Sequence, residues 1–468
     1  MEPALSRTLA KFILGLSWPD VPGPVQDRVR GRVLHGLGAG MAGFRTPFVE
    51  KGLRVTGKLL GQGSATILVD GAKVSPLGAA FVNALAFSIR NMHDSYKVVM
   101  HPSTAVIPAA LAAAETVDAS GRTFAEGVTI GLEVATRMAG GYVWQAQDRG
   151  FRASSVFDTF GAAAASSKIL GLTEDQTVSA LGTAASLACG TSEAQRLGGE
   201  EDGTQEALVA QNGLYAAFLA QDGFQSPESA LDGESGFYTA FVGATPQNDS
   251  AVVEGMGTRW ELMRICSKWI SAIGFNQLPT LLMVNLVKKH RFSAEDVASI
   301  SVEMSRHELI YPSYVIPRRL SVIGAPEYFV AIACVLGDFP RNVPVGQFRP
   351  TVLAQSPQAE LLDLPTSGRV LQTMKKVFVT YGAKRDVYSP RVTVRLNDGR
   401  VLSDEATPEA LQWGLAKEKE VLAPVVPIMG ISPSQWSSLA KTIGRLEKLD
   451  SVGPLLSLTV QDKGNKTA

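Results

Sequence analysis

The segment Ser155–Leu170 reads SVFDTFGAAAASSKIL. Its apolar residues recur at intervals of three and four, the spacing that places them on one face of a helix. The centre, Gly161 to Ala165, carries little side-chain volume, so we expect neighbouring helices to approach it closely. Gly171 follows and predicts the end of the helix. The segment is therefore typical of a tightly packed helical core.

The same pattern recurs on both sides of this segment. Ala- and Leu-rich stretches with helical periodicity cover Pro108–Val117, Phe124–Met138 and Glu206–Gln221. Thr173 begins a capping-box sequence in which Gln176 stands at the third helical position. The first half of the chain therefore predicts a series of helices with defined ends.

The pattern changes after Arg259. Three stretches alternate like strands: Val297–Met304, Lys376–Thr380 and Val387–Leu396. Helical periodicity returns in Thr407–Lys417 and Pro433–Lys448. We therefore expect a mainly α protein, with a large helical domain (residues 1–265), an inserted smaller α+β domain (266–402), and last helices (403–468) that rejoin the first domain.

Composition excludes several classes of partner. The 468 residues carry 44 Lys and Arg against 44 Asp and Glu, so no net charge attracts nucleic acid or an anionic membrane. No stretch predicts a membrane span or a secretory signal. Cys189, Cys266 and Cys334 show neither disulfide nor metal spacing, which indicates a reducing, cytoplasmic compartment. No nucleotide loop or nucleophile elbow occurs, and we predict neither metal nor organic cofactor.

Four blocks carry a resemblance to a known family. They are Leu37–Gly43, then Asn83 through Asn91–Ser95 to His101-Pro102-Ser103, then Gly150-Phe151-Arg152 with Thr159–Ala165, and last Gln211–Phe237. In order and spacing they resemble the MmgE/PrpD family, whose members are mostly cofactor-free lyases and isomerases of small polycarboxylates. The resemblance implies a helical bundle with an α+β lid, a homodimer, and a small-molecule site between the domains.

His101 is the strongest candidate for catalysis. The resemblance implies that it lines the active site, and a histidine can move a proton at a carbon beside a carboxyl group. Pro102 fixes the backbone after it, and we expect Ser103 or Thr104 to cap the helix that follows. That helix N-terminus would favour a substrate carboxylate, with Ser103 in contact with it. The alternative is a helix-entry histidine with a structural hydrogen bond.

The segment before His101 departs from the family pattern. Counted back from His101, Asn91 stands at the family's first Asp, Asp94 at its last Asp, and Ser95 at its Thr. An asparagine cannot take a proton as a carboxylate does. Asp94 is then the candidate to orient His101 or to hold a substrate hydroxyl, with a solvated loop acid as the alternative. Asn91 and Ser95 are candidate substrate-binding residues.

Further positions lose the family's protonatable or cationic groups. Arg152 stands in place of a His, and it would clamp a carboxylate or lie on the surface. Asp202 replaces a Lys and Gln205 replaces a His, which makes the segment acidic. Lys268 matches the family's Lys at the lid entrance, as a catalytic anion-binding group or a surface cation. Gln277 falls where a His is expected and is a candidate substrate-binding residue.

A polar and aromatic band follows in the α+β domain, and one of its members would close over a ligand. Its residues are Tyr311, Tyr314, Arg318, Arg319 and Tyr328. Packing within the domain is the alternative role for most of them.

These substitutions leave three functions open. The first is a lyase or isomerase, of the dehydratase or decarboxylase type, acting beside a carboxyl or carbonyl group. Its substrate would be larger or less charged than methylcitrate, such as a specialised-metabolite intermediate with one carboxyl or a masked anhydride. The second is a non-catalytic binding or partner protein of the same fold. The third is a cyclase or rearrangement catalyst with a larger, more apolar cavity. Convergence of Asp94, His101 and Lys268 would distinguish the first from the second.

Overall fold

The computed structural model describes residues 4–197, 200–244, 252–309, 325–340 and 368–462, with the backbone of 315–316 and 319–320. Tyr311, Tyr314 and Arg318 of the predicted band lie outside these residues, as does the side chain of Arg319. The chain divides into two compact units. The first comprises Met1–Ser192, Glu201–Ile265 and Trp413–Ala468, and the second comprises Glu193–Glu200 and Cys266–Gln412.

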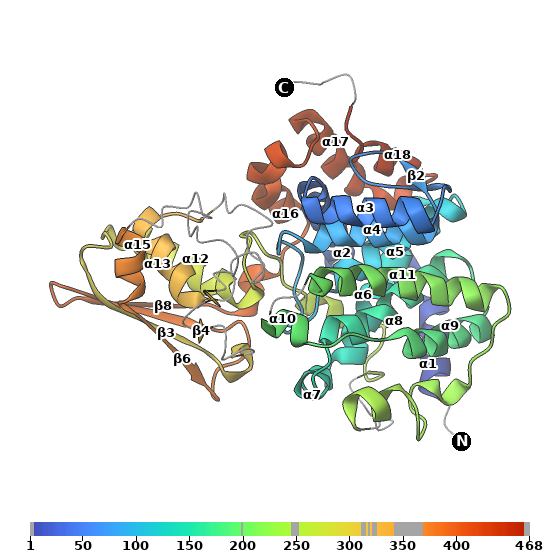
Figure 1. Cartoon of the computed structure of the whole chain (residues 1–468), viewed down its shortest axis with the longest axis horizontal. Coiled ribbons are helices and arrows are strands. Elements are labelled where there is room, and N and C mark those ends of the chain that lie inside the picture. Colours follow the sequence, from blue (N-terminus) through green and yellow to red (C-terminus); the bar gives the residue numbers. More distant parts are fainter. Residues whose placement is uncertain are drawn as a thin grey trace. The chain divides into compact units, whose positions relative to one another are not determined.

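The first unit is a bundle of helices, which confirms the mainly α fold (Figure 1). Its helices are α1 Leu5–Gly15, α2 Gly23–Phe44, α3 Pro47–Leu59, α4 Pro76–Ser88, α5 Pro102–Thr116, α6 Gly121–Ala139, α7 Val143–Asp148, α8 Ala153–Ile169, α9 Glu174–Leu187, α11 Glu201–Gln221, α16 Leu415–Leu422, α17 Pro433–Ile443 and α18 Gly453–Ser457. A small antiparallel pair, β1 Ala65–Thr66 and β2 Lys73–Val74, precedes α4. The C-terminal helices α16 and α17 pack on α2, so the two ends of the chain share one core.

Small residues let the central helices pack closely, as the sequence predicts. A Cβ added to Gly161 of α8 would lie 2.6 Å from the carbonyl oxygen of Gly131 in α6. The same construction at Gly131 meets the carbonyl oxygen of Gly161 at 2.7 Å. Neither position has room for a side chain, because the opposing atom is backbone and cannot move away.

Gly213→Ala is expected to lower the free energy of unfolding by about 1–3 kcal/mol through overpacking. Its new Cβ in α11 would lie 2.4 Å from the Cβ of Ala162 in α8. Gly57→Ala is the matched control, since Gly57 is exposed in α3 and its added Cβ meets nothing within 4 Å. It should raise the stability by about 0.5–1 kcal/mol, the helix propensity difference. Urea denaturation measures both, and equal effects at the two positions would contradict the close packing.

Some helix and strand boundaries agree with those predicted from the sequence, and others differ from them. The capping box of α9 is confirmed, with Thr173 and Gln176 in reciprocal hydrogen bonds. The strand predicted from Val387 begins only at Arg391, because Tyr388 has φ 60 and leaves the extended conformation. The helix predicted over Thr407–Lys417 is also wrong, since a 3₁₀ turn at Pro408–Leu411 precedes α16.

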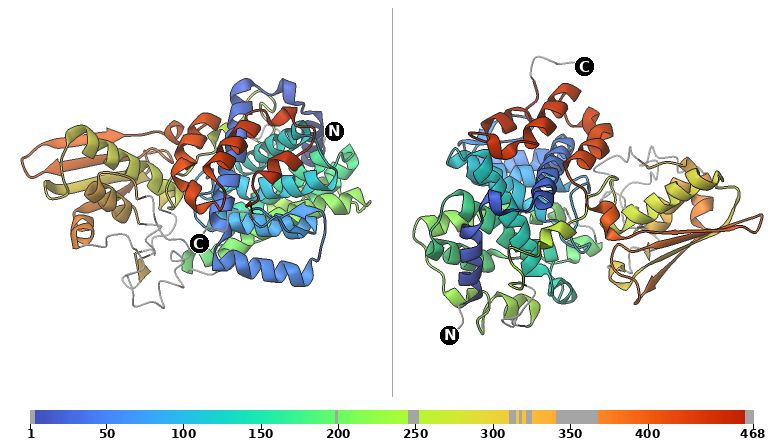
Figure 2. Two further views of the ribbon diagram at one scale, coloured as in Figure 1. Left: turned by 90° about the horizontal axis from the view of Figure 1, so that it is seen from above. Right: turned by 180° about the vertical axis from the view of Figure 1, so that it is seen from behind.

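The second unit is an α+β structure. A four-stranded sheet has the order β6-β3-β7-β8, with β3 parallel to β6 and the other pairs antiparallel. Its elements are α10 Glu193–Leu197, α12 Gln277–His290, β3 Val297–Ser305, β4 Val315–Ile316, β5 Arg319–Leu320, α13 Pro326–Leu336, α15 Gly368–Met374, β6 Val377–Gly382, β7 Arg391–Leu396 and β8 Val401–Glu405. Helices α12, α13 and α15 lie on one face of this sheet (Figure 2). The inward residues Ile300, Val302 and Val392 are accordingly buried.

Glu308, which follows β3, gives the second unit a pH-dependent stability. Its carboxylate accepts hydrogen bonds from the backbone N–H of Ser305 and of Tyr388, both at 2.9 Å. Burial nevertheless raises the pKa of Glu308 to about 7. The native state therefore holds this proton more tightly than the unfolded chain, whose carboxyl titrates near 4.5. The stabilisation that Glu308 gives to the native state is therefore fully present below about pH 4.5 and is lost as the pH rises through 7.

Between pH 4.5 and 7 this loss should be on the order of 3 kcal/mol. We expect Glu308→Gln to flatten the dependence of unfolding free energy on pH, because the amide does not titrate. Chemical denaturation at pH 5 and pH 7.5 measures the slope for both proteins. Glu206, whose pKa also lies at about 7, keeps part of the slope in the variant. An identical slope in the two proteins would contradict this role of Glu308.

In the part of the chain that the structure describes, no helix is both long and apolar enough to cross a membrane.

Candidate functional site

The loop between α4 and α5 returns Asp94 to the start of α5. Asn91, Lys97 and Val98 adopt positive φ values of 52, 47 and 70, and these turn the chain sharply. Tyr96 and Met100 exchange backbone hydrogen bonds of 2.9 and 3.1 Å, which closes the loop. Asn91, half-buried, thus serves a left-handed turn, a conformation that asparagine tolerates well.

Asp94 caps α5. Its carboxylate, fully buried, accepts hydrogen bonds from the backbone N–H of Ser103 at 3.2 and 3.3 Å and from the Ser103 hydroxyl. The expectation that Ser103 or Thr104 caps the helix is therefore wrong, because α5 starts at Pro102 and its cap comes from the preceding loop. The alternative of a solvated loop acid is also wrong. The N–H of Ser103 that would meet a substrate carboxylate already binds a carboxylate of the chain.

His101 stands directly before α5 and is held by backbone and side-chain groups. Its Nδ1 lies 2.8 Å from the carbonyl oxygen of Asp94, and its backbone N–H donates to Oδ2 of Asp158 at 3.3 Å. A carbonyl only accepts, so Nδ1 carries the hydrogen and Nε2 carries the lone pair of the neutral ring. The ring meets that of His93 edge to face, with centroids 4.0 Å apart. This tautomer suits Nε2 to take up or deliver a proton.

Arg152, at the start of α8, binds carboxylates of its own chain. Its Nη2 lies 2.7 Å from Oε1 of Glu206 and 3.2 Å from Oδ1 of Asp202, while Nη1 lies 3.4 Å from Oε1 of Gln205. The side chain is buried, so the alternative of a surface arginine is wrong. In the structure the carboxylates that it holds are those of Asp202 and Glu206 in α11, and its binding of a substrate carboxylate stays a prediction.

Four carboxyl groups gather here, and we call them the acidic cluster: Asp94, Asp158, Asp202 and Glu206. Burial, and then the neighbouring Glu206 and Asp94, raise the pKa of Asp158 well above its ordinary value. Burial also raises the pKa of Glu206 to about 7, against the lowering effect of Arg152. The raised pKa of Asp158 favours its neutral carboxyl form, and Glu206, with a pKa of about 7, is only partly ionised at neutral pH. Those carboxyl groups of the acidic cluster that are ionised repel a further anion.

Three residues around His101 and Arg152 were not predicted from the sequence: His93, Asp158 and Glu206. His93 lies inside the Asn91–Ser95 block, where no neighbouring residue distinguishes it as functional. Asp158 is the one acid in the apolar stretch SVFDTFGAAAA, and an acid amid so many buried positions is a usable signal of function. Glu206 has no such signal, because it follows two other acids, Glu201 and Asp202, at the start of α11. Ser95 is buried, and its hydroxyl donates to the carbonyl oxygen of Val98 at 3.2 Å, within its own loop.

The family is settled by comparison with known proteins. A model of the MmgE/PrpD N-terminal domain matches residues 7–249, more than half of the chain. The chain belongs to the MmgE/PrpD family. It is 26% identical to a cis-aconitate decarboxylase-like protein, oryM, of Aspergillus oryzae over 86% of each chain. It is 26% identical to a cis-aconitate decarboxylase of Aspergillus terreus over 98% of this chain and 96% of that one.

The human cis-aconitate decarboxylase is 30% identical over 53% of this chain and 52% of its own. These MmgE/PrpD relatives are lyases by name, which supports an enzyme of lyase type at the level of the family. Arg152, His101 and the acidic cluster all lie within the part of the chain that the family model matches.

Two further predicted site residues lie in the second unit of this MmgE/PrpD chain. Lys268 is 1% exposed, so the alternative of a surface cation is wrong. Gln277 is fully buried at the start of α12. Its side chain accepts from the N–H of Trp269 at 3.1 Å and donates to the carbonyl oxygen of Ile270 at 3.0 Å, so it braces the segment next to Lys268. A shared pocket of Lys268 with His101 stays a prediction.

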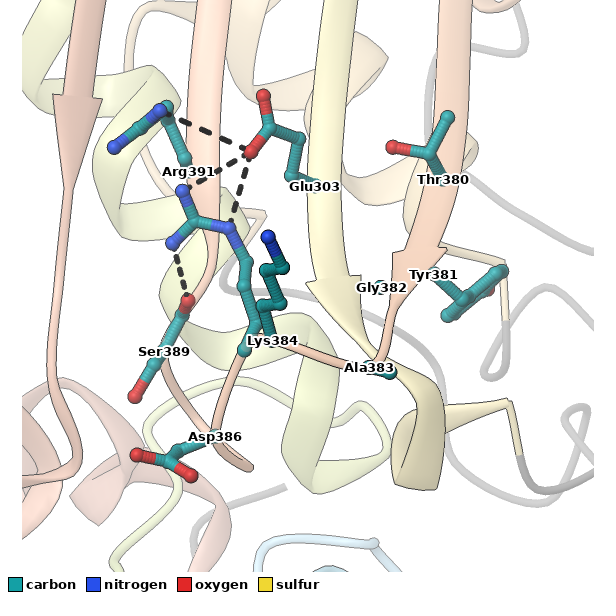
Figure 3. Close-up of a pocket in the computed structure, with 10 residues that line it drawn as sticks. Glu303, Thr380, Tyr381, Gly382, Ala383, Lys384, Asp386, Ser389 and Arg391 are labelled. Carbon is teal, nitrogen blue, oxygen red and sulfur yellow. Dashed lines mark hydrogen bonds and ion pairs between the residues drawn. The ribbon is translucent and has the colours of Figure 1, made fainter.

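The second unit also carries a groove of about 610 Å³ at one end of its sheet (Figure 3). Its lining residues are Glu303, Thr380, Tyr381, Gly382, Ala383, Lys384, Arg385, Asp386, Ser389 and Arg391. Arg385 lies 3.0 Å from the carboxylate of Glu303, and Arg391 lies 2.9 Å from that of Glu405. None of the site residues predicted from the sequence is among those that line it. Its guanidinium groups are paired, so we assign it no catalytic role.

Proposed function

We propose that this chain is a cofactor-free lyase or isomerase that transfers a proton next to a carboxyl or carbonyl group through His101. We further propose that its substrate carries fewer negative charges than methylcitrate or cis-aconitate. The observation that carries the second statement is the pairing of buried Arg152 with Asp202 and Glu206. A guanidinium already neutralised by two carboxylates offers little to a substrate anion.

The acidic cluster supports the same conclusion from a different direction. An incoming tricarboxylate would meet Asp94 at the N-terminus of α5, where the helix dipole and the N–H of Ser103 are already in use. It would also meet Glu206, which is partly ionised at neutral pH. A substrate with one carboxyl group avoids most of this repulsion, while a neutral carbonyl or hydroxyl accepts or donates hydrogen bonds at no charge penalty.

The proton transfer itself needs a base that is held in one orientation. The bond from Nδ1 of His101 to the carbonyl of Asp94 fixes the ring and its tautomer. In a dehydration Nε2 would remove the proton from the carbon beside the activating group, and that proton would leave with the hydroxide of the next carbon as water. In a decarboxylation the protonated Nε2 would give its proton to the carbon that carbon dioxide leaves, and in an isomerisation it would return the proton to a different carbon. The order of these steps depends on whether the substrate is dehydrated, decarboxylated or isomerised.

The purified protein should turn over 2-methylcitrate, citrate and cis-aconitate slowly or not at all. Alkene absorbance and carbon dioxide release measure these reactions beside a matched assay of the His101→Asn variant. Turnover of any of the three at a typical enzymatic rate, about 1–10³ s⁻¹, would contradict the proposed substrate class. Slow turnover that disappears in the variant would support both parts of the proposal.

A second candidate is a non-catalytic binding protein. The observation that favours it is again the cap of α5, because the chain's own Asp94 holds a position suited to a substrate anion. A binding protein predicts that ligands raise the melting temperature of the wild type and of His101→Asn equally, without turnover. Loss of catalysis in the variant with retained binding excludes this candidate.

A further inference from the structure

A second charged group is buried in the first unit, behind the loop that carries His93 and Asp94. It consists of Arg32 and His35 on α2 and Glu418 on α16, each at most 1% exposed. Arg32 Nη2 forms an ion pair with Oε1 of Glu418, and Nδ1 of His35 lies 2.8 Å from Oε2 of the same carboxylate. Three ionisable side chains fully removed from water are costly unless each is paired, and here Arg32 and His35 both pair with the carboxylate of Glu418.

The other ring nitrogen of His35 reaches the candidate site. Its Nε2 lies 2.5 Å from the carbonyl oxygen of Met92. Both nitrogens thus face acceptors, and a ring that donates to both carries two hydrogens. Arg32 supports this state, because its positive charge keeps Glu418 a carboxylate that accepts and does not donate.

The carbonyl of Met92 belongs to the peptide bond that leads into His93. His93 packs edge to face against His101, with centroids 4.0 Å apart, and Asp94 holds Nδ1 of His101 through its own carbonyl. A displacement of the Met92 carbonyl therefore moves both groups that orient the catalytic ring. Even a 1 Å misplacement of a catalytic group lowers rates by about 10²-fold.

We propose that His35, in the doubly protonated form and anchored by Glu418, is a positioning residue that fixes the Met92–Asp94 segment and through it His101. The proposal rests on the proposed function insofar as His101 acts in catalysis. It adds a role for three residues of α2 and α16 that do not belong to the acidic cluster.

Two variants separate positioning through the carbonyl of Met92 from a role in charge alone. In His35→Gln the side-chain amide stands near the place of Nε2 and keeps a donor for the carbonyl of Met92. In His35→Asn the amide stands near the place of Nδ1 and keeps a donor for Glu418 only. The two variants lose the same positive charge, so a role in charge alone predicts equal effects. A role in packing alone would instead follow side-chain volume and would leave the ring signals of His93 and His101 in place.

The first readout is independent of turnover. The full chain has five histidines, so histidine-selective ¹⁵N and ¹³C labelling gives few ring signals to assign. In the wild type at neutral pH we expect both nitrogens of His35 to be protonated. We expect the signals of His93 and His101 to move in His35→Asn and to stay near their wild-type positions in His35→Gln. His290→Gln, in the second unit, is the control and should move neither signal.

The second readout is kinetic, with any substrate that the wild type turns over. His35→Asn should lower kcat by about 10–100-fold with little change in KM. The kcat of His35→Gln should be about tenfold or more above that of His35→Asn. If His35→Asn does not fold, Glu418→Gln replaces it, with the prediction that both ring signals move. Unmoved His93 and His101 signals, or equal effects of His35→Gln and His35→Asn, would overturn the positioning role. Moved signals in a protein without turnover would instead contradict the proposed function alone.

Discussion

The His101→Asn substitution is expected to lower kcat on the natural substrate by about 10²–10⁴-fold, the usual contribution of a general acid or base. Asparagine keeps a donor near the place of Nδ1, so it can retain the bond to the carbonyl of Asp94. It has no group that takes up a proton at the position of Nε2. The substitution therefore removes the chemistry and spares the structural hydrogen bond.

Steady-state kinetics and thermal unfolding, measured together, test this expectation. A purely structural role of His101 predicts that His101→Asn keeps turnover and that His101→Ala, which loses the bond to Asp94, loses both stability and turnover. Retained kcat in a folded His101→Asn protein would rule out His101 as the acid or base. His307→Asn, an exposed histidine of the second unit, is the matched control and should change neither quantity.

The Arg152→Met substitution is expected to lower the free energy of unfolding by about 3–5 kcal/mol at pH 8, because it leaves a buried carboxylate without its partner. Glu206 lies 2.7 Å from the guanidinium and is fully buried. Its pKa of about 7 means that the carboxyl is mostly ionised at pH 8 and mostly neutral at pH 5. The loss should therefore be clearly smaller at pH 5.

A double variant and a control make this prediction specific. Arg152→Met/Glu206→Gln should recover part of the lost stability at pH 8, since the fully buried carboxylate is then gone and the remaining one, Asp202, has a side chain that is 35% exposed to water. Arg149→Met, three residues earlier and exposed, should change stability by less than about 0.5 kcal/mol. A loss that is the same at pH 5 and pH 8 would show that Glu206 is not the group that Arg152 neutralises.

The sequence predicted the parts of the fold that depend on local pattern. Helical periodicity, the capping box at Thr173 and the small residues around Gly161 all correspond to features of the structure. The errors fall where tertiary contacts override local preference. Asp94 caps α5 only because residues with positive φ turn its loop back, and that turn has no simple sequence signal.

The candidate site shows the same limit. Arg152 and Glu206 are 54 positions apart in the sequence, and only the packing of α11 against α8 brings them together. Residue type alone allowed Arg152 to bind a substrate carboxylate or to lie on the surface. In the structure its guanidinium forms ion pairs with Asp202 and Glu206. The loss of a cationic family position at Asp202 was visible in the sequence, but the pairing of Arg152 with carboxylates of its own chain was not.

The central claim is that His101 works in a site suited to substrates of low negative charge, and the most direct test compares substrates with one carbon skeleton. We would measure kcat/KM of the wild type for cis-aconitate and for each of its three dimethyl esters, which keep a single carboxylate, by carbon dioxide release and alkene absorbance. The account predicts that at least one ester is turned over faster than the trianion and that His101→Asn abolishes this reaction. Turnover of the trianion with no turnover of any ester would contradict it.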